Sequence, residues 1–534
     1  MATALLILSI ITFMAIGTTV LLELRRDLMM LQQNSYRRDR YMHWLRTSGD
    51  TTTIAHLTAY VIFFLSLTSL GIEIIITSAG SLYGVIRSWQ LASAKYKKPL
   101  VMTRRAQRIF SVDIILWLVI TAAVVLIFSS GNLTSLFYTA SVGSLGVLCA
   151  SHVVTLLSDL ILSPVEKSIA RKFYRRAQQR LEAMPGLRII GITGSYGKTS
   201  TKHYLHRILS EQFDTLMTPG SFNTTLGVVR TINEHLKPYN EVFIVEMGAK
   251  QTGDIKEICD LVHPTIGIIT SVGPQHLESF KTIENVRDTK FELADALPAD
   301  GLAVINNDFA PSASRAVENT RAVRYGVSNP DGCAFTAKEI VYTPQGTRFT
   351  IAGPDGMEID LSTSLVGECN IANLIAAVIV ALELGVSADK IQYAVASIEQ
   401  VEHRLSLRRI PGGVTIIDDA FNSNPAGSRM ALDVLAMMNQ GKRMVITPGM
   451  IELGDRQYEL NREFGLHMAS CADYALIVGN YNRDAILDGL AQGEMPADRV
   501  LTFDTFLEAN AYAMSIATAG DTILIENDLP DTFK

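Results

Sequence analysis

Charged residues are scarce in this chain of 534 residues. They make up 19% of it, against 48% hydrophobic residues, and the mean hydropathy is +0.22. Because a soluble enzyme normally carries about 25% charged residues, the shortage predicts that part of the chain lies in lipid. At roughly 100–200 residues per domain, the length predicts three or four structural units.

Paired cysteines and a basic stripe are also missing. The five cysteines are scattered and form no C-x-x-C pair, which argues against a cysteine-based zinc site or a disulfide framework. The net charge of −6, with no lysine and arginine stripe in a globular part, gives no sign of nucleic-acid binding. The simplest interpretation is a reduced catalytic part that faces the cytosol.

Long apolar runs are present, and they are confined to residues 1–165. Residues 2–22 are almost uncharged, and the run is long enough to cross a hydrocarbon core of ~30 Å at ~1.5 Å per residue. A signal peptide is the alternative, and it fits less well because no basic region precedes the run. Further runs lie at 54–86, 114–129 and 134–157. We predict about four transmembrane helices, within a range of about three to five, and a multi-pass protein of the plasma membrane.

Basic residues outside these runs bear on topology. The segments 25–46 and 87–108 both look cytoplasmic by the positive-inside rule, which conflicts with a single crossing by 54–86. A re-entrant or double-pass 54–86 would resolve the conflict. Residues 166–186 are predicted to be a basic juxtamembrane helix or linker. It is either a solvated helix or a site for an anionic lipid, and both interpretations place the C-terminal part in the cytoplasm.

A glycine-rich loop opens the next part of the chain, 187–398. Residues 187–192 predict a buried strand, a helical pattern runs to Leu209, and between them stands Thr193-Gly194-Ser195-Tyr196-Gly197-Lys198-Thr199-Ser200. Such a turn lets backbone N–H groups surround phosphate oxygens at a helix N-terminus. Lys198 is expected to neutralise phosphates and Thr199 to offer its hydroxyl to Mg²⁺. The alternative is a glycine turn with no ligand.

This loop and seven further segments resemble the Mur ligase family, closest to its D-alanyl-D-alanine-adding branch. The segments stand in the family's order at 221–227 (SFNTTLG), 245–249 (VEMGA), 271–278 (SVGPQHLE), 289–292 (TKFE), 304–308 (VINND), 418–425 (DDAFNSNP) and 450–454 (MIELG). The resemblance implies a central P-loop ATPase domain at 187–398 and a Rossmann-like α/β domain at 399–534. It also implies an ATP-dependent acid–amino-acid ligase that works through an acyl phosphate.

The resemblance assigns roles to residues of this chain. Lys198, His276, Lys290 and Arg404 are expected to be catalytic. Two Mg²⁺ ions are expected, held by Thr199, Glu246, His276 and a carbamylated Lys290. The residues expected to bind ATP are Gly194, Ser195, Gly197, Lys198, Thr199, Ser200, Asn306, Asn373, Arg404 and Asp419. Asn223, Asn422 and Asn424 are expected to contact substrate. Taken one by one, Glu246 could instead be an ordinary strand-end glutamate, His276 a structural histidine and Lys290 a surface lysine.

Two departures from the family concern the substrate. Apolar runs occupy the place of the family's N-terminal domain, which holds the UDP end of the precursor. The branch's basic K-G-S-R segment is replaced by acidic residues at 525–531 (IENDLPD). We therefore expect a lipid-linked or membrane-proximal cell-envelope precursor as the carboxylate, and an amino acid or dipeptide as the amine. The alternatives are a catalytically idle nucleotide-binding scaffold for other envelope-synthesis proteins and a polyglutamate-type synthase.

Overall fold

The computed structural model describes residues 2–68, 73–96, 98–343, 346–420 and 423–528. The chain divides into two compact units, which we call the helical unit (Met1–Ala170) and the α/β unit (Arg171–Asp528). The predicted domain boundaries at 165, 186 and 398 stay predictions, although each of the two sheets lies within one of the predicted α/β parts.

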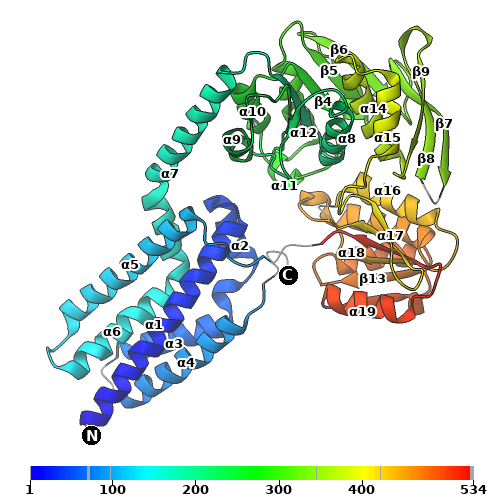
Figure 1. Cartoon of the computed structure of the whole chain (residues 1–534). Coiled ribbons are helices and arrows are strands. Elements are labelled where there is room, and N and C mark those ends of the chain that lie inside the picture. The colour runs from blue at the N-terminus through cyan, green and yellow to red at the C-terminus, as the bar shows by residue number, and fades with distance from the viewer. Residues whose placement is uncertain (1, 69–72, 97, 344–345, 421–422, 529–534) are drawn as a thin grey trace. The chain divides into compact units, whose positions relative to one another are not determined.

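The helical unit consists of helices packed side by side (Figure 1). Their bounds are α1 (Ala2–Gln33), α2 (Arg38–Thr47), η1 (Asp50–Thr52), α3 (Ile54–Ser66), α4 (Glu73–Ser93), α5 (Arg104–Phe128), α6 (Leu133–Cys149) and α7 (Ser151–Glu182). Small residues let α1 and α4 approach closely, because a Cβ added at Gly84 would lie 2.8 Å from the backbone carbon of Ala15. The hydroxyl of Thr19 donates to the Gly84 carbonyl oxygen at 2.9 Å across this contact. Such contacts are typical of helices that pack in lipid.

Two helices are long and apolar enough to cross a membrane, Thr3–Gln33 and Arg104–Phe128. A third crossing results if α6 and α7, which are bent by 76° at their junction, form one span. The described residues thus give two or three spans, fewer than the four predicted, and three is the lower end of the predicted range. The predicted run 134–157 is not one helix because it breaks at Ala150. In 54–86 the structure shows two helices, of which α3 has 13 residues and is shorter than the roughly 20 that a crossing needs.

The α/β unit begins with a mostly parallel sheet of nine strands in the order β2-β3-β1-β4-β5-β6-β7-β8-β9. Only β8 pairs antiparallel with its neighbours β7 and β9. The strands are β1 (Arg188–Thr193), β2 (Thr215–Met217), β3 (Val242–Glu246), β4 (Ile266–Ile269), β5 (Leu302–Asn306), β6 (Arg321–Gly326), β7 (Phe335–Thr343), β8 (Gly346–Ala352) and β9 (Glu358–Thr363). Residues of β1, β3, β4 and β5 are buried on both faces, as expected for parallel strands covered by helices.

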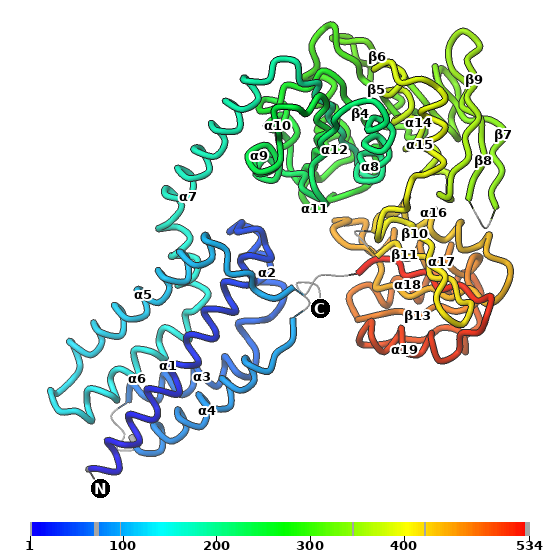
Figure 2. Tube along the Cα trace, in the orientation of Figure 1, coloured from blue at the N-terminus to red at the C-terminus, as the bar shows by residue number. Residues whose placement is uncertain are grey.

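Helices cover both faces of this sheet. One apolar core joins the sheet to α8 (Lys198–Leu209), α14 (Glu368–Glu383) and α15 (Ala388–Ala396), and Figure 2 traces these three helices together. A second core on the other face involves α9 (Thr225–Glu234), α10 (Asp254–Val262) and α12 (Ile283–Asp295). Short helices α11 (Leu277–Phe280) and α13 (Ala310–Ala313) lie in the connections. The two cores fix the carboxyl ends of the central strands.

A second sheet follows, with six strands in the order β10-β11-β15-β12-β13-β14. Only β10 is antiparallel. The elements are β10 (Ser406–Arg409), β11 (Thr415–Asp419), α16 (Pro425–Ala436), β12 (Arg443–Thr447), α17 (Gln457–Cys471), β13 (Tyr474–Val478), α18 (Arg483–Gln492), β14 (Val500–Phe503), α19 (Phe506–Ile516) and β15 (Thr522–Glu526). The α/β fold that the resemblance implies for this part of the chain is confirmed.

The last turns of α7 belong to the α/β unit. Ala177 is fully buried in the core with α9 and α10. The guanidinium of Arg180 donates to the carbonyl oxygens of Asn233 at 2.5 Å and of Leu236 at 2.8 Å, at the C-terminal end of α9. Arg180 therefore serves the protein's own packing. The other basic residues of this helix are exposed, as a solvated helix requires: Lys167, Arg171, Lys172, Arg175 and Arg176.

Candidate active site

The glycine-rich loop stands where the sequence predicts it, between β1 and α8. Gly197 has a φ of 79°, and a Cβ there would lie 2.4 Å from the side-chain oxygen of Asn373, so the position requires glycine. Lys198 is the first residue of α8, and its ammonium donates to the carbonyl oxygens of Gly194 at 2.6 Å and Ser195 at 3.3 Å. The lysine is thus folded over the loop whose backbone N–H groups would face phosphate.

Neighbouring parallel strands end beside this loop. Ile192 of β1 pairs with Glu246, the last residue of β3. On the other side of β1, Ser271 follows β4 and its hydroxyl accepts the backbone N–H of Tyr196 at 2.6 Å. Asn306, at the end of β5, donates its side-chain N–H to the Thr270 carbonyl oxygen at 2.9 Å. The carboxyl edge of the sheet therefore gathers polar groups around the loop, as in other open α/β sheets that bind ligands.

Glu246 is almost fully buried and is already paired. One carboxylate oxygen lies 2.9 Å from the ammonium of Lys202, and the other accepts the side-chain N–H of Asn223 at 3.1 Å. Burial raises the pKa of Glu246, but Lys202 and Lys198 outweigh it and hold the pKa below its usual value. Glu246 is therefore a carboxylate at neutral pH.

The second sheet contributes the opposite wall. Arg404 precedes β10, and Asp419 is the last residue of β11. A carboxylate oxygen of Asp419 accepts the backbone N–H of Leu405 at 3.0 Å. Burial raises the pKa of Asp419 to about 6, although Arg404 opposes the shift. The adjacent Asp418 is instead held by His403, whose Nδ1 lies 2.9 Å from it.

A cavity of about 240 Å³ lies between these walls. Most of the predicted site residues line it: Ser195, Gly197, Lys198, Thr199, Ser200, Asn223, Glu246, Asn306, Asn373, Arg404, Asp419 and Asn424. Burial lowers the pKa of Lys198 to about 8, although Glu246 opposes the shift. The arrangement presents cations and hydrogen-bond donors to one space, which is what binding and polarising a phosphate chain requires.

His276 and Lys290 are not among the described residues that line the cavity. Nδ1 of His276 contacts the carboxylate of Glu452, which comes from the second sheet's side. Burial lowers the pKa of His276, and Glu452 opposes the shift. Lys290 is buried in α12, where loss of hydration lowers the pKa of its amine well below the usual value. These residues lie outside the cavity wall, and their predicted metal roles stay predictions.

Of three further predicted site residues, one precedes the cavity lining, one lies outside the described residues and one also caps a helix. Gly194 lies just before the lining residues, and with a φ of 149° it packs its backbone against Thr270 and Ser271. Asn422 lies outside the described residues. Asn424 is the N-cap of α16, where its side-chain oxygen accepts the backbone N–H of Gly427 at 2.7 Å.

Sequence reasoning assigned no individual role to three charged residues around the site. Lys202 neutralises Glu246 and stands four residues after Lys198 on the same helix, so its spacing was available as a signal. Glu452 lies in a segment that resembles the family, but no role was inferred for it. Glu526, at the end of β15, accepts a hydrogen bond from the Ser423 hydroxyl. Burial and Asp419 raise the pKa of Glu526 well above its usual value.

Comparison with protein families gives two matches. The Mur ligase middle domain matches residues 192–381, and the Mur ligase glutamate ligase domain matches residues 403–526. Among curated proteins, the UDP-N-acetylmuramoyl-tripeptide–D-alanyl-D-alanine ligase of Escherichia coli K12 is 31% identical over 337 residues, which cover 62% of this chain and 74% of that enzyme. The Bacillus subtilis enzyme of the same name is 28% identical, with coverages of 52% and 60%.

Solved structures agree with these matches. MurF from Acinetobacter baumannii superposes with a TM-score of 0.60 at 27% identity, covering 67% of this chain and 77% of that one. MurF ligase from Thermotoga maritima in complex with ADP gives a TM-score of 0.60 at 25% identity, with coverages of 67% and 80%. Residues 1–191 precede both family matches.

Proposed function

This chain belongs to the Mur ligase family of ATP-dependent amide-forming ligases, and we propose that it joins an amino acid or dipeptide to a carboxylate of a cell-envelope precursor at the membrane. The observation that carries the proposal is the cavity that gathers Lys198, Glu246, Arg404 and Asp419 from two sheets. An idle fold would have no need to bring two cations and two carboxylates to one space.

Each wall of the cavity has a distinct task in the proposed reaction. ATP supplies the phosphoryl group that turns the substrate carboxylate into an acyl phosphate, which the amine then attacks with release of phosphate. Lys198 and Arg404 neutralise phosphate oxygens, and the guanidinium of Arg404 offers several fixed donors. Asp419 accepts the ribose hydroxyls, and Asn306 and Asn373 orient the nucleotide. Asn223 and Asn424 contact the substrates, as does Asn422.

The residues proposed for Mg²⁺ fit oxygen-rich coordination in part. Glu246 is ionised, and a carboxylate that accepts two hydrogen bonds keeps lone pairs for a metal beside the Thr199 hydroxyl. For a second ion, Glu452 contacts Nδ1 of His276 and so leaves Nε2 for the metal, which is how a carboxylate orients a metal-binding histidine. The lowered pKa of Lys290 supports carbamylation, because the reaction with carbon dioxide needs the neutral amine.

The helical unit supports the proposal that the reaction takes place at the membrane. It has two helices apolar and long enough to span a bilayer, and it stands in the part of the chain that precedes the family matches. We infer that the catalytic part works in the cytoplasm on a lipid-linked or membrane-proximal carboxylate, and that the amine is related to the D-alanyl-D-alanine named for the curated relatives.

ADP release by the full-length protein in detergent tests the proposal. Mg²⁺-ATP is combined with a panel of amino acids and dipeptides, D-alanyl-D-alanine among them, and with either a lipid extract of the host or a soluble UDP-linked muramoyl peptide. Lys198→Ala should lower substrate-dependent release about 10²–10³-fold, the usual cost of removing a donor to developing negative charge. Lys237→Ala is the matched control, because this lysine is exposed and distant in sequence from the loop.

Different results of this experiment would contradict different parts of the proposal. Efficient use of the soluble UDP-linked peptide by a chain lacking residues 1–165 would contradict the proposal that the carboxylate substrate is lipid-linked or membrane-proximal. ATP binding without ADP release under any combination would overturn the ligase proposal and favour the scaffold. Repeated addition of glutamate to one acceptor would favour the polyglutamate-type synthase.

A further inference from the structure

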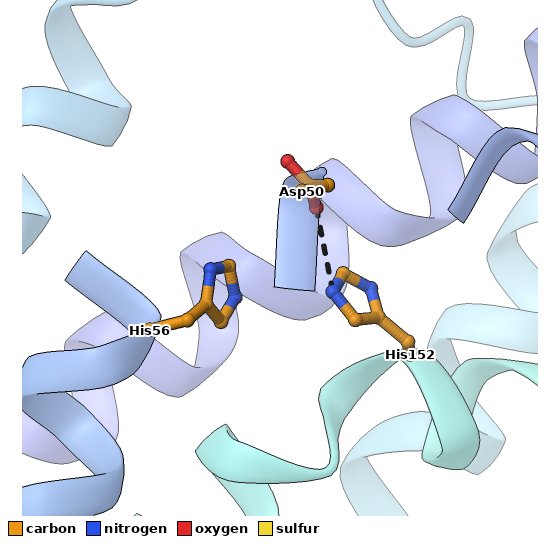
Figure 3. A group of neighbouring side chains, drawn as sticks. All are labelled: Asp50, His56 and His152. Carbon is orange, nitrogen blue, oxygen red and sulfur yellow. Dashed lines mark ion pairs between the residues drawn. The ribbon is translucent and has the colours of Figure 1, made fainter. Parts of the chain in front are cut away.

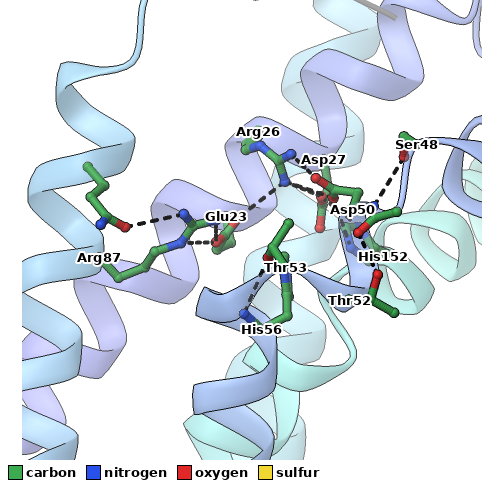
Figure 4. A network of polar contacts seen from close by, with 12 residues as sticks. Glu23, Arg26, Asp27, Ser48, Asp50, Thr52, Thr53, His56, Arg87 and His152 are labelled. Atoms are coloured by element: carbon green, nitrogen blue, oxygen red, sulfur yellow. Dashed lines mark hydrogen bonds and ion pairs between the residues drawn. The ribbon is translucent and has the colours of Figure 1, made fainter. Parts of the chain in front are cut away.

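The helical unit contains a buried polar cluster that the ligase reaction does not use (Figure 4). Its acidic members on α1 are Glu23 and Asp27, which are 1% and 0% exposed. Nε of Arg87 donates to a carboxylate oxygen of Glu23 at 2.7 Å, and Nη1 of Arg26 donates to a carboxylate oxygen of Asp50 at 3.0 Å. Charged groups are expensive inside an apolar helical bundle, so a buried cluster of this kind marks a functional or structural site.

Two histidines and one aspartate meet within this cluster (Figure 3). Asp50 lies in η1, His56 in the first turn of α3, and His152 in the first turn of α7. One potential ligand atom from each lies within 4.8 Å of the other two. All three side chains are more than nine-tenths buried, with exposures of 7%, 3% and 6%.

The two imidazole rings are oriented by their outer nitrogens. Nδ1 of His152 lies 2.8 Å from a carboxylate oxygen of Asp27, and Nδ1 of His56 lies 2.8 Å from the hydroxyl of Thr53. Neither Nε2 atom makes a hydrogen bond to a described residue, although Nε2 of His152 has an ion-pair contact with Asp50. A histidine that binds a metal nearly always donates its other ring N–H to a carboxylate or another oxygen, and each Nδ1 here lies close to such an oxygen.

We propose that Asp50, His56 and His152 bind a divalent transition-metal ion of the zinc class through one carboxylate oxygen and the two Nε2 atoms. Nε2 of His152 lies 3.3 Å from Asp50. That separation suits two ligands of one tetrahedral ion with bonds of ~2.0–2.1 Å. The ligand atom of His56 lies within 4.8 Å of both. Imidazole nitrogens favour such an ion over Mg²⁺ or Ca²⁺, which prefer oxygen.

A proton is the competing way to balance this cluster. Among the ion-paired members of the cluster, three carboxylates (Glu23, Asp27 and Asp50) face two guanidiniums (Arg26 and Arg87), so one positive charge is lacking among them when both histidines are neutral. Protonation of His152 would supply it, since that ring lies between Asp27 and Asp50. It would leave Nε2 of His56 buried without a partner, at a cost of about 1–3 kcal/mol. A metal ion satisfies both Nε2 atoms at once.

The proposed ion would hold together segments that are far apart in sequence. It would tie η1 and the start of α3 to the first turn of α7, next to the 76° bend between α6 and α7. Trp44 of α2 lies against the His152 ring at a centroid distance of 6.5 Å and shields the cluster with Tyr41. The proposal concerns the helical unit alone and does not depend on the ligase activity.

Metal analysis of the full-length protein tests the site. The protein is purified in detergent without a metal-affinity tag and analysed by inductively coupled plasma mass spectrometry. About one zinc-class ion per chain is expected, falling below about one tenth in His56→Ala and in His152→Ala. His467→Ala is the matched control. His467, with Asp433 and Cys471, forms another group of potential ligands in the α/β unit, and its loss should leave the ion in place.

A second measurement covers variants that fail to fold. Wild-type protein is stripped with a chelator and titrated with Co²⁺, whose visible absorption reports tetrahedral coordination, and Zn²⁺ should displace it. A wild-type protein that carries no stoichiometric transition metal and takes up none at micromolar Zn²⁺ would overturn the proposal and leave the protonated His152. Loss of the ion in His467→Ala, with retention in His56→Ala, would overturn it as well.

Discussion

Lys198 and Asp419 line the same cavity, and burial changes the pKa of each in opposite senses. The pKa of Lys198 falls to about 8 and that of Asp419 rises to about 6. In the free protein Lys198 therefore loses its charge above about pH 8, and Asp419 loses its charge below about pH 6. Both ionised forms coexist only between these values.

The first prediction is a bell-shaped pH dependence of kcat/KM for ATP, with limbs near pH 6 and pH 8, because this parameter reports ionisations of the free enzyme. Asp419→Asn should lower kcat/KM about tenfold or more at pH 7 and remove the acid limb, since asparagine cannot ionise. Steady-state kinetics across pH 5–9 with saturating Mg²⁺ measures both effects. An acid limb that persists unchanged in Asp419→Asn would show that Asp419 is not its source.

At the scale of elements, the N-terminus of α16 combines a structural and a proposed substrate role in one residue. Asn424 caps the helix by accepting the Gly427 backbone N–H, and it also lines the cavity. A cap of this kind contributes about 1 kcal/mol. Serine can replace the cap but not the amide group, so the two roles are separable.

The second prediction uses that difference. Asn424→Ala should lower the free energy of unfolding by about 1 kcal/mol, whereas Asn424→Ser should leave it nearly unchanged. If Asn424 also contacts substrate, both variants should raise the KM of one substrate severalfold. Thermal unfolding and steady-state kinetics give the two readouts. Full activity in Asn424→Ser would restrict the residue to helix capping.

At the scale of the whole molecule, an apolar helical unit and an α/β unit share one chain. The exposed apolar side chains of α5, such as Leu118, Leu126 and Phe128, would be costly in water. A bilayer removes that cost, which is why we attach the proposed reaction to a membrane surface.

The third prediction follows from this division. The full-length protein should sediment with membranes and resist extraction by alkaline carbonate, whereas a chain of residues 171–534 should stay in the supernatant and still bind ATP. Fractionation with immunoblotting and nucleotide-binding assays tests both statements. Release of the full-length protein by carbonate alone would contradict a spanning helical unit.

The local pattern of the sequence was sufficient for the central architecture. The strand, glycine loop and helix around Lys198 were predictable because β1, the loop and α8 are contiguous and each has its own residue signature. Strands β11, β12 and β13 of the second sheet were predictable for the same reason. The apolar run 134–157 misled the prediction because hydropathy does not register the break at Ala150, which depends on how α6 and α7 pack.

By itself the sequence determined the fold class, the phosphate loop and the family. These depend on short-range periodicity and on ordered motifs. Only the tertiary structure decided which polar side chains lie together: Lys202 with Glu246, Glu452 with His276, and His56 with His152. Cysteine spacing argued against a C-x-x-C zinc site but carried no information about histidines on separate helices. Contacts between distant segments arise from packing, because burial makes each charge depend on whichever partner the fold brings within a few ångströms.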